Sequence, residues 1–429
     1  MASGAHVERH DSLLNAITGR CRIAARSGFA LGSGMILAQA RALVQAVIDP
    51  LPLTDFMAAV EASRAMDVPG GADHPRALLF GRDPGQVVLA AHATHSATLD
   101  SHSPAPTGPK PVAVQCVDPG DFRALIGRFH DNGYTVRVPD VVPLSPPLQS
   151  FARALEALLH QPVTASLFWS VDRARAVVHY DENDIIVVQL SGRKRWWIST
   201  EPAELDIGWK KPGRGETQLG AHRVVEVGPG DLLYIPRGTP HTVESLSDSL
   251  HLSILFTPLT VREAVIAALD HLANTTLPLR QTALATNRGS TPGDEVAAFD
   301  ARIVDAVALL LDRCRSDTFI ATALQKRAAR MVGALPALEK MATGAVTPAT
   351  IVEHAPYAIN AMLATPGWID WAQPGGHIHI HRGVEEGLRF MAETASFRVG
   401  DIPGDGIGDA VRVALAERFL ASGFLRIAH

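Results

Sequence analysis

The sequence feature that most constrains this chain is a histidine and an aspartate two residues apart, directly before an apolar segment. His179 and Asp181 precede a β-branched run at residues 185–190. In an extended chain, residues i and i+2 point to the same face, so this imidazole and carboxylate converge on one point. Gly192 is a turn signal, and we expect a second strand at residues 193–198 that pairs with the first as a hairpin.

A third candidate ligand ends a turn rich in glycine and proline. The turn residues 228–230, a short apolar run and the segment Pro-Arg-Gly-Thr-Pro at 236–240 lead to His241. These residues restrict the backbone, so we expect His241 to be held at the start of the next extended run, residues 242–244. Two histidines and one carboxylate occupy one face of a metal and leave the opposite positions open, as in non-haem Fe(II) oxygenases.

The alternative for a His-x-Asp pair taken alone is an exposed or hydrogen-bonded pair without a metal. The surrounding chain favours the metal. The pair precedes an apolar strand, a glycine turn and a basic-aromatic strand, and the turn before His241 follows at a distance that suits a small barrel. We therefore predict that His179, Asp181 and His241 are metal ligands.

The segments 179–196 and 228–241 resemble the JmjC-type cupin oxygenases, and among them the ribosomal-oxygenase branch. The resemblance implies an enzyme that uses Fe(II), 2-oxoglutarate and O2 to hydroxylate a protein side chain. It implies that His179, Asp181 and His241 bind the iron and are the catalytic residues.

The resemblance also implies a binding site for the cosubstrate. Lys194, in the basic run after the glycine turn, corresponds to the residue that binds the far carboxylate of 2-oxoglutarate; the alternative is a surface lysine on a basic strand. Strand alternation turns Arg193 and Arg195 away from the face of Lys194, toward solvent or a partner. Ser253, on a later predicted strand, is a further candidate for hydrogen bonding to 2-oxoglutarate.

Short strands separated by Gly and Pro turns predict a double-stranded β-helix, the jelly roll of the cupins, within an α+β protein that has flanking helices. Residues 74–80 are predicted to form a short strand early in the chain. Further strands are expected at 134–138, 163–170, 224–227, 232–235, 242–244 and 250–256, and helices at 35–48, 148–159, 261–272, 294–314 and 317–332.

We expect four regions along the chain. They are an N-terminal helical region at 1–73, a JmjC/cupin catalytic domain at 74–258, a helical region at 259–345 and a small mixed domain at 346–429. The resemblance implies that the third region mediates dimerisation, which predicts a homodimer, and that the last is winged-helix-like. Because the last region lacks a basic recognition face, we expect a structural or protein-contact role for it.

Composition limits the partners of this protein. The net charge of −5 does not indicate a nucleic-acid-binding surface. The three cysteines are scattered without a Cys-x-x-Cys pair, which is typical of reduced intracellular proteins: Cys21, Cys116 and Cys314. No uninterrupted apolar run approaches the ~18 residues of a membrane span, and the N-terminus lacks a signal-peptide pattern. We therefore expect no membrane partner and a cytoplasmic location.

The leading functional expectation is an Fe(II)- and 2-oxoglutarate-dependent dioxygenase acting on a protein or peptide, with a ribosomal protein as the substrate implied by the resemblance. Two alternatives stay open. One is a biosynthetic β-hydroxylase of a small peptide or amino acid, and the other is a non-catalytic cupin that serves as a scaffold or binding module. Three further histidines, His377, His379 and His381, share one strand face, where we expect exposed or hydrogen-bonded side chains.

Overall fold

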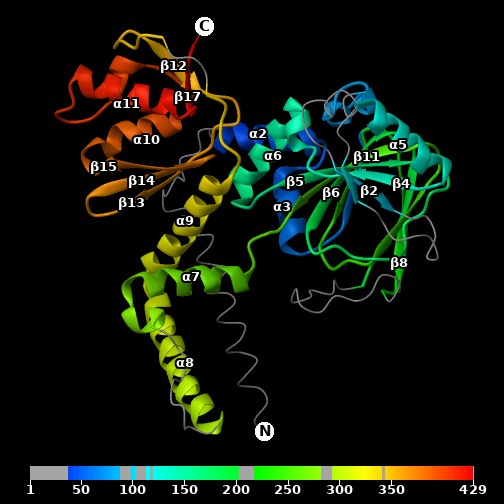
Figure 1. The fold of residues 1–429 in the computed structure, drawn as a ribbon, viewed down its shortest axis with the longest axis horizontal. Coiled ribbons are helices and arrows are strands. Elements are labelled where there is room, and N and C mark those ends of the chain that lie inside the picture. Colours follow the sequence, from blue (N-terminus) through cyan, green and yellow to red (C-terminus); the bar gives the residue numbers. More distant parts are fainter. Residues whose placement is uncertain are drawn as a thin grey trace. The chain divides into compact units, whose positions relative to one another are not determined.

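The computed structural model describes residues 37–86, 98–102, 113–115, 119–201, 217–281, 292–340 and 344–428 (Figure 1). Its described residues belong to two compact units. The barrel unit contains residues up to 259 together with 353–359, and the C-terminal unit contains residues 260–352 and 360–428. Two of the cysteines, Cys21 and Cys116, lie outside the described residues.

The larger sheet of the barrel unit has eight strands, and every neighbouring pair in it is antiparallel. Its order is β1-β9-β6-β11-β5-β4-β2-β3. The strands are β1 (Met66–Val68), β2 (Thr98–His102), β3 (Ala113–Gln115), β4 (Thr135–Val138), β5 (Thr164–Ser170), β6 (Asp184–Ser191), β9 (Leu232–Ile235) and β11 (Ser249–Phe256).

The smaller sheet has the order β10-β7-β8. Its strands are β10 (His241–Ser245), β7 (Lys194–Ser199) and β8 (His222–Val227). The segment before the predicted ligand pair runs antiparallel beside β10, with Ala176 N donating to Val243 O at 2.9 Å. It extends the smaller sheet on that side, and the two sheets together form the expected jelly-roll barrel of an α+β protein.

The predicted hairpin between the apolar strand and the basic strand is wrong. β6 lies between β9 and β11 in the larger sheet, whereas β7 lies between β10 and β8 in the smaller one. Gly192 turns the chain from one sheet to the other with a φ of 65°. A Cβ at Gly192 would approach Asp248 O to 2.0 Å, so only glycine fits this turn. Because β6 is buried along nearly its whole length, its pairing is decided by distant strands rather than by the adjacent turn.

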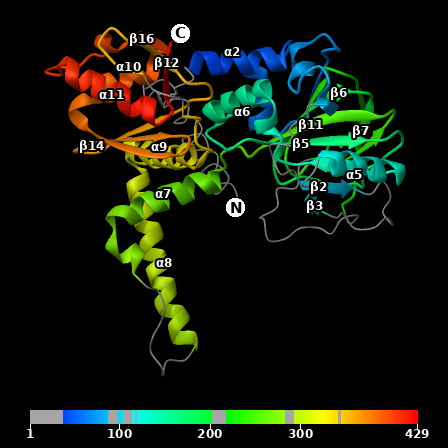
Figure 2. The same cartoon turned by 45° about the horizontal axis from the view of Figure 1, so that its top comes forward.

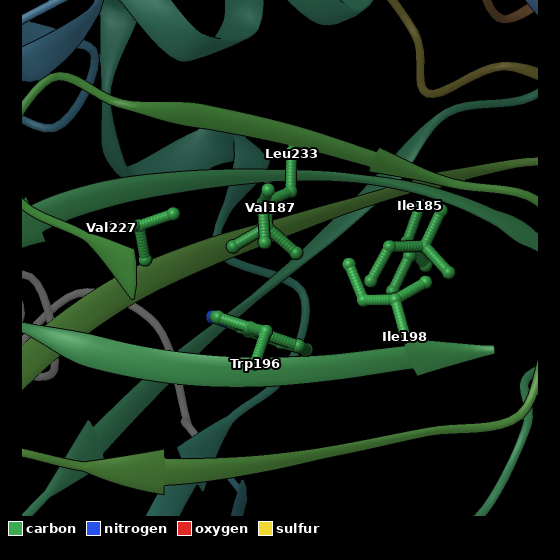
Figure 3. Packing of buried hydrophobic residues seen from close by; sticks show 7 residues of the cluster. Ile185, Val187, Trp196, Ile198, Val227 and Leu233 are labelled. Carbon is green, nitrogen blue, oxygen red and sulfur yellow. The ribbon is translucent and has the colours of Figure 1, made fainter. Parts of the chain in front are cut away.

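Alternate residues of these strands fill the space between the two sheets. Figure 3 shows Trp196 and Ile198 of β7 pointing toward Ile185 and Val187 of β6 and Leu233 of β9. All five side chains are buried. Burying each such side chain contributes about 1.5–3 kcal/mol, so this cluster holds the two sheets together.

Helices cover the outer side of the barrel unit. In α2 (Leu37–Ile48) the buried residues Ala40, Val44, Val47 and Ile48 recur at helical spacing, and Figure 2 shows this helix lying beside α6 (Pro146–Leu159). Helix α3 (Leu53–Glu61) and helix α5 (Pro119–Asp131) belong to the same unit. Among the described residues no single helix is long and apolar enough to cross a membrane. Helices α2 and α3 meet that length and composition only as a pair, across a bend of 85°.

The expected strand at residues 74–80 is also wrong, because Pro75–Leu78 form a 3-10 helix. Pro75 stands at its first position, and His74 Nδ1 accepts a hydrogen bond from Arg76 N at 3.2 Å. The Arg76 side chain is fully buried. Its guanidinium donates to the carbonyl oxygens of Val47 (3.0 Å), Asp49 (2.6 Å), Val68 (2.9 Å) and Gly230.

The C-terminal unit contains three longer helices, two sheets and two shorter helices. Its core includes Trp371, which packs against Phe419 and Phe424 with ring centroids 4.7 Å and 5.0 Å away. The winged-helix likeness of its last part stays a prediction. The elements are α7 (Val261–Thr275), α8 (Pro292–Cys314), α9 (Asp317–Ala334), the sheet β13-β14-β15 (Ala361–Ala364, Trp368–Gln373, Gly376–His381), the sheet β16-β12-β17 (Ser396–Arg398, Ile351–His354, Leu425–Ile427), α10 (Glu385–Glu393) and α11 (Asp409–Ala421).

Replacing Arg76 tests how strongly one side chain ties the N-terminal helices to the barrel. We expect Arg76→Met to lower the free energy of unfolding by roughly 3–5 kcal/mol, because four carbonyl oxygens lose their donor and three of these hydrogen bonds are buried. Urea unfolding followed by circular dichroism measures this difference. The exposed Arg82→Met is the control and should leave the midpoint unchanged, and equal midpoints for both variants would contradict the expectation.

Candidate metal centre

The three predicted metal ligands come together at one end of the smaller sheet. One ligand atom from each of His179, Asp181 and His241 lies within 4.8 Å of the other two, and this is the only such group found among the described residues. His241 Nε2 is 3.6 Å from Asp181 Oδ2, and the two imidazole centroids are 4.4 Å apart. The convergence of these three side chains, which the sequence spacing predicted, is therefore confirmed. The group could hold one metal ion.

Both imidazoles are oriented by backbone carbonyl groups. His241 Nδ1 lies 2.9 Å from Thr239 O, and His179 Nδ1 lies 2.8 Å from Val177 O. A proton on each Nδ1 satisfies these contacts and leaves the Nε2 lone pair free for a metal. Burial, and to a smaller extent the neighbouring His179 ring, lower the pKa of His241 to about 4, so the His241 ring is neutral near pH 7, the form that binds metals.

Backbone hydrogen bonds fix the distance between the first two ligands and the third. His179 N donates to His241 O at 3.0 Å, and His241 N donates to His179 O at 2.8 Å. Gly238 N donates to Asp181 O at 2.9 Å, which ties the turn before His241 to the His-x-Asp segment. The ligand positions therefore follow from main-chain pairing, which side-chain motion does not disturb.

Asp184, which the sequence analysis did not single out, supports the same turn. Its buried carboxylate accepts a hydrogen bond from the Tyr234 hydroxyl and another from Arg237 N at 3.2 Å. Burial raises the pKa of Asp184, and these two donors act against that rise by stabilising the charged form. Asp184 thus anchors the chain between the strand β9 and His241. The position of Asp184, three residues after Asp181, is the sequence feature that points to this role.

Lys194 lies inside the barrel, so the alternative of a surface lysine is wrong. Only 2% of its surface is exposed, and Nζ donates to Ser170 Oγ at 2.7 Å. Among the described residues no carboxylate pairs with it. Burial lowers the pKa of Lys194 from 10.5 to about 7. Arg193 and Arg195 point outward, as alternation predicts, and both pair with Glu226.

The other predicted cosubstrate residue, Ser253, is also buried. It lies on β11 opposite Ser166 of β5, on the same strand face as His251. His251 stacks on Phe168 with centroids 5.0 Å apart, and Trp196 contacts both His251 and the candidate ligand His241, at centroid distances of 5.6 Å and 5.9 Å. Polar and aromatic groups therefore line the interior between the triad and Lys194.

The three C-terminal histidines behave as the sequence indicated. They lie on β15, where His377 Nδ1 is 2.9 Å from Asp370 Oδ1 of β14. His379 Nε2 is 3.5 Å from the same oxygen, and its side chain is mostly exposed. These residues form a hydrogen-bonded strand face, and they do not meet the geometry of the His179 group.

The buried amine of Lys194 has no acidic partner among the described residues, so we predict that the stability of the protein depends on pH. The unfolded state binds more protons than the folded state between pH 7 and 10.5, so stability should rise with pH in that window. A pKa moved from 10.5 to about 7 corresponds to roughly 5 kcal/mol. We expect Lys194→Met to be more stable than the parent by up to that amount below pH 7, with the advantage shrinking as the pH rises to 10.

Thermal unfolding of the metal-free protein at several pH values measures this difference. The exposed Lys340→Met serves as the matched control, since its amine is solvated in both states. A stability difference between Lys194→Met and the parent that stays constant from pH 6 to 10 would contradict the expectation.

The fold and the ligand group define a cupin-type barrel with two histidines and one carboxylate on one face. Residues 146–264 match the family model of the JmjC domain. The chain therefore contains a JmjC domain. That segment includes the three candidate ligands, Lys194 and Ser253.

Comparison with solved structures places the wider fold near the ribosomal oxygenases. The ribosomal oxygenase YcfD from Escherichia coli, in complex with cobalt and succinic acid, superposes with a TM-score of 0.52 at 15% identity, over 89% of this chain and 99% of that chain. The same protein in complex with cobalt and 2-oxoglutarate gives a TM-score of 0.51 at 14% identity, over the same shares of both chains. At this identity the likeness establishes the fold.

Curated relatives match mainly the barrel region. The bifunctional lysine-specific demethylase and histidyl-hydroxylase NO66 of Drosophila sechellia is 30% identical over 132 residues, which is 29% of this chain and 20% of that protein. The NO66 protein of Aedes aegypti is 25% identical over 230 residues, 49% of this chain and 35% of that protein. The chain thus spans a fifth to about a third of the length of these two relatives.

Proposed function

We propose that this protein is an Fe(II)- and 2-oxoglutarate-dependent dioxygenase that hydroxylates a side chain of a protein or peptide. The observation that carries the proposal is the convergence of His179, Asp181 and His241 in one barrel with the buried amine of Lys194. Two imidazoles and one carboxylate are the donor set that suits Fe(II) and leaves positions open. The solved complexes of YcfD with cobalt and 2-oxoglutarate support the same assignment by similarity of fold.

The triad, Lys194 and two backbone carbonyl groups have separate roles in the proposed reaction. Iron held by the triad would supply the coupling of O2 reduction to oxidative decarboxylation of 2-oxoglutarate, which yields succinate, CO2 and a hydroxylated C–H position. Lys194 binds the far carboxylate, because a charged amine in a dry barrel attracts an anion more strongly than it does in water. The carbonyl groups of Thr239 and Val177 hold the two imidazoles in the metal-binding tautomer.

The substrate is proposed by similarity. YcfD is described as a ribosomal oxygenase and NO66 as a histidyl-hydroxylase and lysine demethylase, which favours a protein side chain and makes a ribosomal protein the first candidate. A biosynthetic β-hydroxylase of a small peptide or amino acid would use the same residues on another target. Mass spectrometry of ribosomal proteins incubated with the enzyme separates the two, because only the first adds an oxygen atom to a ribosomal peptide.

Succinate formation tests the proposed chemistry directly. After anaerobic loading with Fe(II), we expect the parent to convert 2-oxoglutarate to succinate when O2 is admitted, and His179→Ala to lose nearly all turnover because one of three ligands is gone. Lys194→Ala should need far more 2-oxoglutarate for the same rate. His222→Ala, an exposed histidine on β8, is the matched control and should retain parent activity.

Binding measurements decide between the enzyme and the scaffold. If the parent binds neither Fe(II) nor 2-oxoglutarate, the hypothesis of a non-catalytic cupin scaffold replaces the hypothesis of an enzyme.

We also propose that a second copy of the chain covers the helices α7 and α8, forming a homodimer. On α8 the residues Ile303, Val304, Val307 and Leu311 form an apolar stripe at helical spacing, and Val304 and Leu311 are 65% and 61% exposed. On α7 the residues Val261, Val265, Ile266 and Leu269 are exposed as well. Contiguous exposed apolar surface of this kind is typical of a protein interface.

Charge placed on this stripe should separate the two copies. We expect the double variant Val307→Glu with Leu311→Glu to shift the protein from dimer to monomer in analytical ultracentrifugation, since two carboxylates would have to be buried. Asp305→Lys lies on the opposite side of α8 and is the control. A parent that is monomeric at all concentrations would overturn the proposed dimer.

A further inference from the structure

The two segments that contain the metal ligands are joined by side chains outside the triad. The carboxylate of Asp184, a residue that is 2% exposed, accepts hydrogen bonds from the Tyr234 hydroxyl and from Arg237 N at 3.2 Å. Tyr234 belongs to β9, and Arg237 belongs to the turn that leads to His241. Asp184 itself is the first residue of β6. One carboxylate therefore connects the start of β6, the strand β9 and the turn that follows β9.

The chain at the end of β11 holds the same two segments from a third side. Thr257 Oγ1 donates to Asn183 Oδ1 at 2.6 Å, and Arg237 Nη1 donates to Pro258 O at 3.5 Å. Asn183 lies two residues after the ligand Asp181. The His-x-Asp segment and the turn before the third ligand therefore both bond to residues 257–258.

The position of the Asp181 carboxylate depends on these contacts more than the two imidazoles do. The imidazoles lie on residues that exchange main-chain hydrogen bonds, whereas the Asp181 side chain is 35% exposed and its main chain is tied to the turn by Gly238 N. The next fixed point along the chain is Asp184. Because metal–ligand distances are fixed to within about 0.2 Å, a small shift between Asp181 and the turn weakens metal binding.

Tyr234 gives this arrangement a rigid support. Its side chain is fully buried and packs edge-on against Phe56 of α3, with ring centroids 5.5 Å apart. The ring also stacks on Phe256 of β11 at a centroid distance of 6.4 Å. A tyrosine ring held on two sides fixes the position of its hydroxyl group, so the hydroxyl in turn fixes the Asp184 carboxylate.

We propose that Asp184 is a positioning residue of the metal centre, and that its two hydrogen bonds set the affinity of the site for a divalent metal ion. The inference rests on the proposed function, because it concerns the same metal centre. Asp184 acts through the main chain on either side of it and does not bind the metal. Loss of its hydrogen bonds moves the turn that leads to His241 relative to Asp181 and leaves all three ligands present.

Equilibrium binding of Co(II) to the metal-free full chain tests this inference without turnover. Asp184→Asn keeps the shape of the side chain and turns an amide N–H toward one of the two donors. We expect its Co(II) affinity in isothermal titration calorimetry to fall by roughly 10–100-fold, as is typical when a group that orients metal ligands is lost. The visible absorption bands of bound Co(II) should shift, because the ligand geometry changes.

Tyr234→Phe is a second variant that keeps the carboxylate. It removes one donor and leaves the bond from Arg237 N in place, so Co(II) affinity should fall by about fivefold. In the Fe(II) enzyme, excess Fe(II) should restore turnover to both variants, because their ligands are intact. His179→Ala should stay inactive at every Fe(II) concentration.

Glu156→Gln is the matched control. Glu156 is a buried carboxylate of α6 that also accepts from a main-chain N–H, Val163 N at 3.1 Å, and it pairs with Arg153 at 2.9 Å. These partners belong to α6 and to the chain before β5, outside the ligand-bearing segments. Glu156→Gln should lower the midpoint of thermal unfolding and leave the Co(II) affinity and absorption spectrum at the parent values.

The outcomes separate this inference from the proposed function. A parent that binds no Co(II) would remove the metal centre, and both proposals would fail. If the parent binds Co(II) and Asp184→Asn keeps its affinity and spectrum, Asp184 serves only the fold and this inference alone is overturned. Equal losses of affinity in Glu156→Gln and Asp184→Asn would also overturn it, because general destabilisation would then account for both. If Asp184→Asn does not fold, Tyr234→Phe decides by the same criteria.

Discussion

The metal centre depends on one pair of main-chain hydrogen bonds, those that His179 and His241 exchange with each other. In an antiparallel sheet such a pair brings two Cα atoms to about 5.5 Å with side chains on one face. The reciprocal bonds of 3.0 Å and 2.8 Å therefore place two imidazoles side by side before any metal arrives. Asp181 follows from the same strand by alternation. The bond from Gly238 N to Asp181 O prevents the turn from moving away.

Strand β7 joins the stability of the barrel to its chemistry. Lys194, Trp196 and Ile198 point inward on the same face, because successive side chains alternate. Ile198 belongs to the apolar cluster between the sheets, Trp196 contacts both the cluster and the ligand His241, and Lys194 donates to Ser170 Oγ. The packing of Ile198 and Trp196 that aligns β7 therefore also sets the distance between the candidate metal ligands and Lys194.

The interior contains buried polar groups that oppose folding. Among the described residues, the Lys194 amine has no acidic partner and His251 Nδ1 has no hydrogen-bond partner, and each of them destabilises the folded protein. Burial also makes the electrostatic attraction between the Lys194 amine and an anion stronger than it would be at a solvated site. The buried Asp184 is different, since Tyr234 and Arg237 donate to it within the protein itself. Its role is to hold a turn, and it needs no ligand.

The sequence alone predicted that His179, Asp181 and His241 come together, because His179 and Asp181 depend on local alternation and His241 follows a turn whose geometry its own prolines and glycines restrict. It also determined most strands and helices, since their periodicity is local. Tertiary structure decided which strands pair. β6 and β7 adjoin in the chain and lie in different sheets, because β6 is buried on both faces and needs distant neighbours. The surroundings of Lys194 come from distant strands, so Ser170 and His251 lie beside it only through a strand register that no short segment encodes.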